Sequence, residues 1–259
     1  MYSYALFTWG WGANGANGLG NTTHHSVPMQ VGVQTDWTYV FESNAAVFAI
    51  KSNGTLWTWG GNGNGALGLG DAANRSSPVQ VGNLSDWSKV QASQTGATLA
   101  IKTDGTLWAW GYGSYGAHGL GDTANRSSPV QVGSLTTWST VRGGGDMAFA
   151  IKTDGTLWGW GRNNNGNLGQ SNTTERSSPV QVGTLTDWAS LAKDSEGQKA
   201  VAIKTDGTLW VWGKGTNGGL GLGNTTNYSS PVQLGHHSDW LQVALNDTRT
   251  IIGIRKAYQ

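Results

Sequence analysis

The residues most able to support chemistry lie in a glycine-rich segment that follows a pair of tryptophans. This segment, GYGSYGAHGLGD, runs from Gly111 to Asp122 and contains a GxGxxG pattern at Gly111, Gly113 and Gly116. The pattern cradles phosphates where it links a strand to a helix in a βαβ unit. No helical period follows it here, so we interpret the glycines as a loop that needs positive φ angles.

Aspartates are the next candidates, and they recur at two kinds of position. One kind precedes a lone tryptophan and the other lies in a predicted tight turn; they are Asp36, Asp86, Asp187 and Asp239, and Asp104, Asp154 and Asp206. An acid–base pair needs two different environments, whereas a repeated position gives each carboxylate the same one. We therefore expect both sets to cap turns.

Histidines and arginines offer two further kinds of site. The doublets His24-His25 and His236-His237 lie on opposite sides of equivalent short strands, which places them at opposite rims and not in one metal site. Three arginines occupy equivalent positions in the repeats: Arg75, Arg126 and Arg176. Their side chains could either bond within their own loops or form a rim that binds anions. The sequence thus predicts no catalytic residue, no metal and no cofactor, so we do not expect an enzyme.

Aromatic residues could instead bind a ligand by stacking. The tryptophan pairs fall in the middle of predicted strands, where packing in the core explains them. Trp11, Tyr112 and Tyr115 fall in loops and are the candidates for exposed stacking against a sugar or a base.

Composition narrows the class of protein. The chain has 259 residues, a net charge of +1, 12% charged residues and no cysteine. Without a basic stripe or an acidic tail, neither nucleic acid nor an anionic membrane is an expected partner. No signal peptide or transmembrane run is recognised, which predicts synthesis in the cytoplasm and leaves the final location unknown. The 41 glycines and 15 tryptophans suggest many short strands and turns.

The tryptophans reveal an internal repeat. The second member of each pair recurs at spacings of 50, 51, 50 and 52, as do the five prolines and the lone tryptophans; these second members are Trp9, Trp59, Trp110, Trp160 and Trp212. Such a period indicates stacked supersecondary units. We expect a single domain, with units at about 10–59, 60–110, 111–160, 161–212, and 213–259 joined by 1–9.

Each unit contains four strand signals. In the second unit they are PVQVG from Pro78, WSKVQAS from Trp87, then TLAIK and TLWAW on either side of a Thr-Asp-Gly turn. Both faces of the inner strands are apolar, so each sheet should be covered on both sides. The predicted fold is all-β: a closed five-bladed β-propeller, in which the first strand, YALFTWG, completes the last blade.

The repeated sequence also resembles a known family. The order LWxWG, LGLGD, RSSPVQVG and a D-W step is similar to the regulator of chromosome condensation repeat, over nearly the whole chain. The resemblance implies a propeller, usually of seven blades, in a family that includes a nucleotide exchange factor for a small GTPase, an ultraviolet-B photoreceptor and many interaction modules. Five units, the lack of a wedge-like insertion and the lack of histidine or tryptophan in the variable segments argue against transferring either specialised activity.

One segment of the repeat varies in length while all others are constant. The distance from the lone tryptophan to the isoleucine of the AIK motif is 13, 14, 13, 15 and 14 residues. Loops of variable sequence on a rigid scaffold are where specificity usually resides, although drift in unconstrained turns would look the same. The candidate binding residues in these turns are Glu42, Gln94, Arg142, Asp146, Lys193, Asp194, Glu196, Asp247 and Arg249.

Two functions of different class fit these observations. The first is a non-catalytic interaction or assembly module that binds protein, or further copies of itself, through the variable turns, as on the surface of a phage or virus particle. The second is a lectin-like adhesin with repeated weak sites for glycans, in which multivalency supplies the avidity. Nucleotide exchange on a small GTPase is retained only as what the resemblance implies.

Overall fold

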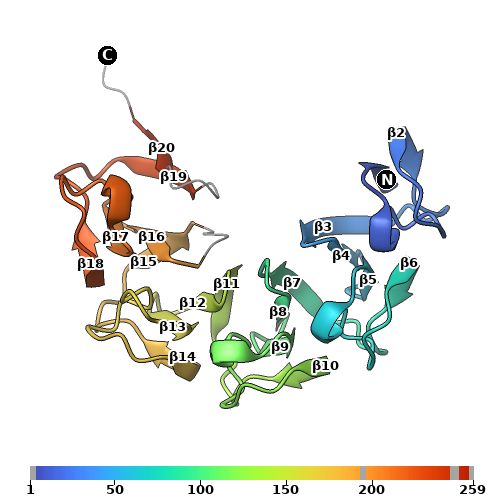
Figure 1. Cartoon of the computed structure of the whole chain (residues 1–259), viewed down its shortest axis with the longest axis horizontal. Coiled ribbons are helices and arrows are strands. Elements are labelled where there is room, and N and C mark those ends of the chain that lie inside the picture. The colour runs from blue at the N-terminus through green and yellow to red at the C-terminus, as the bar shows by residue number, and fades with distance from the viewer. Residues whose placement is uncertain (1–3, 193–196, 246–250, 257–259) are drawn as a thin grey trace. The chain divides into compact units, whose positions relative to one another are not determined.

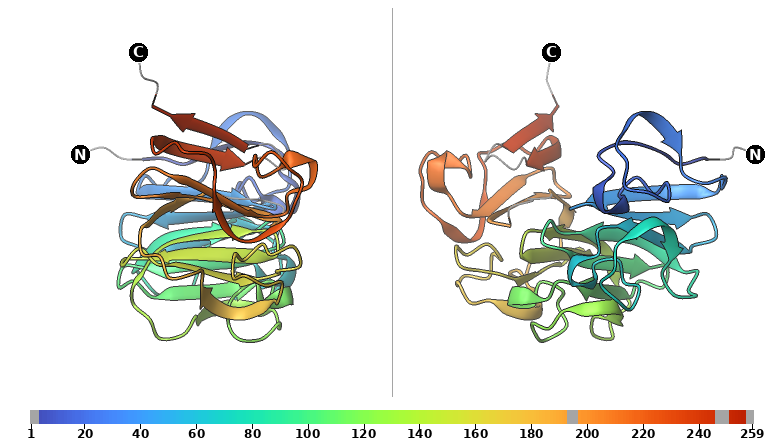
Figure 2. Two further views of the ribbon diagram at one scale, coloured as in Figure 1. Left: turned by 90° about the vertical axis from the view of Figure 1, so that its left-hand side faces the viewer. Right: turned by 45° about the vertical axis from the view of Figure 1, so that its right-hand side comes forward.

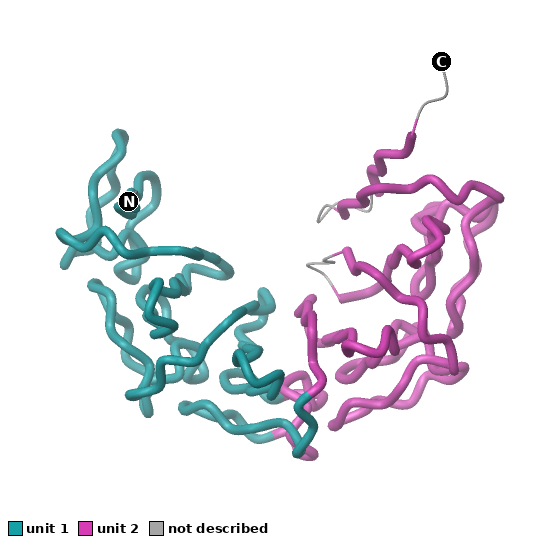
Figure 3. Tube along the Cα trace, turned by 180° about the vertical axis from the view of Figure 1, so that it is seen from behind, with its two compact units in different colours: residues 1–113, 124–136 teal, residues 114–123, 137–259 magenta. Residues whose placement is uncertain are grey.

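The computed structural model describes residues 4–192, 197–245 and 251–256. Short antiparallel strands make up the chain, and its only helices in these ranges are single 3-10 turns (Figure 1). None of the described helices could cross a membrane. The chain divides into two compact units, which are residues 1–113 with 124–136, and residues 114–123 with 137–259 (Figure 3).

The first unit contains one two-stranded and two four-stranded sheets. Each four-stranded sheet is an antiparallel meander. In chain order its elements are β1 Phe7–Gly10, η1 Ala13–Gly15, β2 His25–Gln30, β3 Trp37–Ser43, β4 Ala46–Lys51, β5 Leu56–Gly60, η2 Gly63–Gly65, β6 Arg75–Gln80, β7 Trp87–Ala92, β8 Ala97–Lys102, β9 Leu107–Gly111 and β10 Arg126–Gln131.

The second unit repeats this arrangement and ends in a two-stranded sheet. Its elements are η3 Ser114–Gly116, β11 Trp138–Gly144, β12 Met147–Lys152, β13 Leu157–Gly161, β14 Arg176–Gln181, β15 Trp188–Leu191, β16 Lys199–Lys204, β17 Leu209–Gly213, η4 Thr216–Gly218, β18 Tyr228–Gln233, β19 Trp240–Leu245 and β20 Ile251–Arg255. The predicted four-stranded repeat is therefore confirmed. Within the described residues, β1 pairs only with β2 and β20 only with β19.

The strand that contains the proline, which is the fourth strand of its sheet, begins earlier than predicted. We expected the strand to start at Pro78, but β6 starts at Arg75. Gly60 pairs with Arg75 and Thr58 with Val79, so β6 carries an irregularity that contains the proline. Because β6 is an outer strand, the missing N–H of Pro78 breaks no ladder on its free side.

The second tryptophan of each pair holds a strand against a loop of the preceding repeat. In the first unit the indole N–H of Trp59 donates to the carbonyl of Ala16 at 3.0 Å, and that of Trp110 to Ala66 at 2.8 Å. Both rings are almost completely buried. A Cβ on Gly68 would lie 2.8 Å from the Trp110 ring nitrogen, so this loop position accepts only glycine without a shift. Core packing, as predicted, is confirmed for Trp59 and Trp110, whereas Trp9 in the first repeat is 62% exposed.

The second unit uses the same bond. Trp160 donates to the carbonyl of Ala117 at 3.0 Å, and Trp212 to that of Asn167 at 2.8 Å. Ala117 lies in loop 114–123, which therefore packs with this unit.

The aspartates that precede the lone tryptophans form ion pairs and do not cap turns, which corrects the prediction. The buried Lys51, Lys102 and Lys204 place their ammonium groups 3.2, 3.4 and 3.4 Å from carboxylate oxygens of Asp36, Asp86 and Asp187, respectively. Each ammonium also lies over two indole rings, as in Lys102, 4.2 Å from the centre of Trp108 and 5.1 Å from that of Trp87. Cation–π attraction supports the lysine where it is buried.

The aspartates of the tight turns do cap them, as predicted. A carboxylate oxygen of Asp104 accepts bonds from the backbone N–H of Thr106 at 2.9 Å and from its hydroxyl at 2.7 Å. The Thr106 hydroxyl in turn accepts the indole N–H of Trp108 at 2.9 Å. Asn53 makes the equivalent bonds with its amide oxygen.

Substituting the three turn aspartates by asparagine should make the protein less sensitive to acid. Hydrogen bonds from Thr106 lower the pKa of Asp104, and bonds from Thr156 and Thr208 do the same for Asp154 and Asp206. A lowered pKa in the folded state stabilises the protein above the unfolded value of about 3.9, and this contribution is lost as the pH falls through the folded value.

The triple variant D104N/D154N/D206N keeps the acceptor oxygen, as Asn53 does naturally. We expect its melting temperature to fall less between pH 5 and pH 2 than that of the unmodified chain, as followed by circular dichroism. An identical acid dependence would show that other carboxylates dominate.

Thr137→Asp should stabilise the repeat that lacks the ion pair. Thr137 stands where the other repeats have aspartate, and burial lowers the pKa of Lys152, whose ammonium lies 3.7 Å from the centre of Trp158. Because Thr137 is exposed, a carboxylate there adds attraction without burial. We expect a gain of about 0.2–1 kcal/mol in the free energy of unfolding by urea, as for exposed pairs. Thr136→Asp, one residue earlier, is the control and should change little.

Candidate functional site

The variable segments lie at one end of each sheet. Because neighbouring strands are antiparallel, the turn between the first and second strands shares an end with the loop between the third and fourth (Figure 2). We call this end of a unit its variable rim. In the first unit it comprises the β3–β4 turn at 44–45, the β7–β8 turn at 93–96 and the loops that contain η1 and η2.

The candidate residues of the first unit are both exposed. Glu42 lies in β3 and not in the turn, opposite Val47 of β4, whereas Gln94 lies in the turn after β7. Between Glu42 and β4, Asn44 and Ala45 have φ angles of 49° and 65°, which give the tight left-handed turn of a hairpin.

The candidate residues of the second unit are engaged in local contacts. Arg142 lies in β11, half-buried, and donates to the carbonyl of Val141 at 3.1 Å. Asp146 lies in the turn that follows and pairs with Arg162 at 3.4 Å. Five further candidates fall outside the described residues: Lys193, Asp194, Glu196, Asp247 and Arg249.

A cavity of about 390 Å³ opens at the variable rim of the first unit. Trp11 lines it together with the β3–β4 turn, the η2 loop and the β7–β8 turn. Trp11 and the variable turns, predicted separately, are thus brought together. The cavity residues that the sequence analysis did not select include Asn14, Ser43, Asn64 and Thr95.

Trp11 presents its ring to solvent. Its side chain is 57% exposed, and the ring stacks on that of His24 with centres 6.4 Å apart and planes 19° apart. The Nδ1 atom of His24 accepts the backbone N–H of Gly12 at 2.9 Å, which fixes the imidazole in place. Trp11 is therefore an exposed aromatic residue, and its stacking against a ligand stays a prediction.

The wall of the cavity is polar but carries no charge. Every lining residue is a tryptophan, asparagine, serine, threonine, alanine or glycine. Asn14 and Asn74 bind each other across the rim at 3.1 Å. The hydroxyl of Ser43, whose residue is 5% exposed, has no hydrogen-bond partner among the described residues. This oxygen is itself inaccessible, so it does not contribute to the exposed wall.

The two tyrosines predicted to stack lie in different units. Tyr112 is half-buried in the first unit. Tyr115, in the second, is 36% exposed and already has the guanidinium of Arg162 stacked 4.9 Å from its ring centre. Neither therefore offers as free a ring as Trp11.

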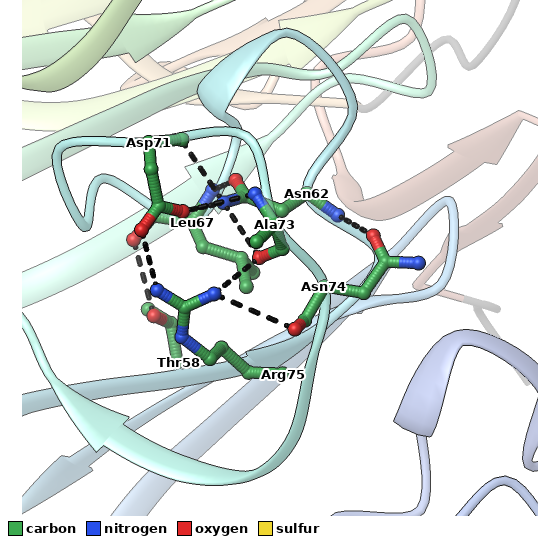
Figure 4. Close-up of polar contacts among 7 residues, drawn as sticks. All are labelled: Thr58, Asn62, Leu67, Asp71, Ala73, Asn74 and Arg75. Atoms are coloured by element: carbon green, nitrogen blue, oxygen red, sulfur yellow. Dashed lines mark hydrogen bonds and ion pairs between the residues drawn. The ribbon is translucent and has the colours of Figure 1, made fainter.

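Arg75 is held within its own loop and so is not free to form an anion-binding rim. Its guanidinium donates to Asp71 at 2.6 Å and to the carbonyl of Ala73 at 2.7 Å (Figure 4). Bonds from the Arg75 side chain and the Ala73 N–H lower the pKa of Asp71. The fully buried amide of Asn62 ties the same loop to Leu67 and Ala73. The local bond expected for Arg75 is confirmed.

The repeat itself decides the family. The model of the regulator of chromosome condensation (RCC1) repeat matches residues 53–99, 104–151, 154–192 and 206–251. The chain belongs to the RCC1 repeat family. Its repeated four-stranded sheets are therefore blades of a β-propeller fold, as predicted.

Individual relatives agree with this assignment. The ultraviolet-B receptor UVR8 of Arabidopsis thaliana is 30% identical over 155 residues, which are 56% of this chain and 34% of that protein. Human WBSCR16 superposes with a TM-score of 0.77 at 18% identity, over 94% of this chain and 65% of that one. Yeast RCC1 (Prp20), solved with Kap60 bound, gives a TM-score of 0.77 at 16% identity, over 92% and 58%. The chain thus spans about a third of the curated relative and less than two thirds of the solved chains.

The cavity was not predicted from the sequence, although the order of the strands contained part of the information. Trp11 follows the third strand of its repeat, so antiparallel topology alone places it at the same end as the variable turns. The order of the strands could have placed Trp11 at this end of the sheet. Which turns lie next to Trp11 depends on the packing of neighbouring sheets, and the sequence does not give this packing.

Proposed function

We propose that the chain is a non-catalytic interaction module that binds a protein partner through the variable rim. The observation that carries this proposal is the contrast between scaffold and turns. In the first unit the second strands β4 and β8 are buried along their whole length, whereas Glu42 and Gln94 project from the adjoining segments into solvent. A rigid support with exposed, variable segments is the usual design of a recognition surface.

Solved relatives support a protein as the partner. One yeast structure contains RCC1 (Prp20) with Kap60, and another report on Prp20p concerns its binding to Gsp1p and histones. These relatives are at most 18% identical to the chain and longer than it, so they indicate the class of partner and not its identity. Nucleotide exchange and a place on a virus particle rest on resemblance and composition alone.

We further propose that the propeller closes by pairing β20 with β1, as the sequence predicts. In the second unit, Ile252 and Ile254 of β20 are 64% and 57% exposed. The preceding loop is also uncovered: a Cβ on Gly218 would meet nothing within 4 Å, whereas one on its equivalent Gly166 would lie 2.5 Å from the Ser229 Cα. Among the described residues, β20 thus has one edge without a paired strand, and the face that it shares with the η4 loop is uncovered.

The first unit carries the complementary features. Trp9 of β1 is 62% exposed, while its equivalent Trp59 is 2% exposed. Alignment of the repeats places Thr8 opposite Ile252, in the register in which Thr58 pairs with Phe48. Closure would also allow the indole N–H of Trp9 to donate to the carbonyl of Gly219, which is the equivalent of Ala16 in the bond from Trp59.

Charge reversal on the rim should abolish partner binding without loss of stability. The variant E42K/Q94K adds positive charge at exposed positions of the first unit. We expect the proteins that co-purify with the tagged chain, identified by mass spectrometry, to be lost from this variant, and its melting temperature to change by less than about 2 °C.

The matched control is S52K/T103K, which adds lysines to exposed turns at the other end of the same blades. It should retain every partner. Equal loss from both variants, or a large loss of stability in E42K/Q94K, would contradict binding through the rim.

A cysteine pair tests closure directly, because the chain has no cysteine of its own. Residues paired across antiparallel strands have Cα atoms about 4.5–5.5 Å apart, within reach of a disulfide. We expect T8C/I252C to form an intramolecular disulfide on oxidation, seen as a faster-migrating monomer on non-reducing gels. The pair T8C/I254C, out of register, should cross-link poorly. Disulfide-linked dimers from T8C/I252C would show that the edge pairs with a second chain.

A further inference from the structure

We propose that the cavity beside Trp11 binds a neutral saccharide, at one site per chain. This site differs from the protein-binding role of the rim, because it depends on a concave, uncharged pocket and not on exposed charges. Its volume of about 390 Å³ lies within the range of about 300–1,000 Å³ typical of small-molecule sites.

The absence of charge in the wall limits the class of ligand. None of the lining residues is ionisable. A phosphate, a nucleotide or an acidic sugar would be desolvated there without a counter-charge, which is costly. The uncharged wall therefore favours a neutral ligand.

The polar groups of the wall favour a ligand rich in hydroxyls. Amides both donate and accept, as a sugar hydroxyl does. Asn44 and Asn64 place two amides on the wall, and Thr95 adds a hydroxyl bonded to that of Ser93 at 2.9 Å.

Trp11 supplies the apolar contact that a pyranose ring needs. An indole ring is flat and amphipathic, and the C–H groups on one face of a sugar pack against it. His24 holds this ring by stacking on it, and the side chain remains 57% exposed, so the platform is formed before the ligand arrives. A peptide would need an apolar pocket for an anchoring side chain, and the remaining apolar residues of the wall are only alanines and glycines.

The site is expected once per chain, which differs from the repeated pockets considered from the sequence. The residues equivalent to Trp11 in the other repeats are Gly61, Tyr112, Arg162 and Lys214. A saccharide should therefore bind with a stoichiometry of one.

The test is a glycan array of neutral and acidic glycans with the full chain, followed by calorimetric titration of the saccharides that bind. We expect neutral glycans to bind at one site. Trp11→Ala should weaken binding at least about tenfold, on the scale of lost aromatic stacking, and Trp11→Phe should restore part of it. Gly63→Leu, at a lining position where a Cβ meets nothing within 4 Å, should block binding by filling the cavity.

Tyr115→Ala is the control, since it removes an exposed aromatic residue that does not line this cavity. It should leave binding unchanged, and melting curves should show all variants folded. The proposal is overturned if the array gives acidic glycans only or none. It is also overturned if neutral glycans bind equally well to Trp11→Ala and Gly63→Leu.

Discussion

The hydrogen bond from a buried indole to the loop of the preceding repeat is the constraint on which each unit depends. It fixes Trp59 against Ala16 and Trp110 against Ala66, and it requires a glycine close to the ring because no Cβ fits there. A tryptophan, a glycine and a carbonyl must therefore recur together. This explains why the glycines next to the rings, Gly18 and Gly68, each lie nine residues after the second tryptophan of their repeat.

Away from this bond, blades are also stabilised by the ion pair and cation–π contacts of a buried lysine. A buried lysine lies between two indoles and reaches an aspartate on the neighbouring strand. At Thr137 the aspartate is missing, and within the described part of the chain Lys152 lies over two indole rings without an ion pair. The scaffold thus tolerates the loss of one charge, because the cation–π contacts and the two-sided core still support the lysine.

Periodicity made most of the fold predictable and most of the site unpredictable. Strand signals recur in all five repeats, and the tight hairpin turns and the buried second tryptophans recur in four, so each was inferred from several copies. Trp11 and the turn at Asn44 occur once, and their meeting depends on the left-handed turn geometry of Asn44 and Ala45. The role of the aspartates was misjudged for a related reason: Asp86 and Lys102 are 16 residues apart, and only the pairing of β7 with β8 brings them together.

The position of Trp11 also determines how such a scaffold can acquire new specificity. The equivalent residues are a glycine, a tyrosine, an arginine and a lysine, so the indole–carbonyl bond places no demand on this position. Each blade can then exchange one side chain at its rim while its core sequence stays the same. Recognition can evolve, or be engineered, blade by blade, with the cost of each trial confined to a single exposed residue.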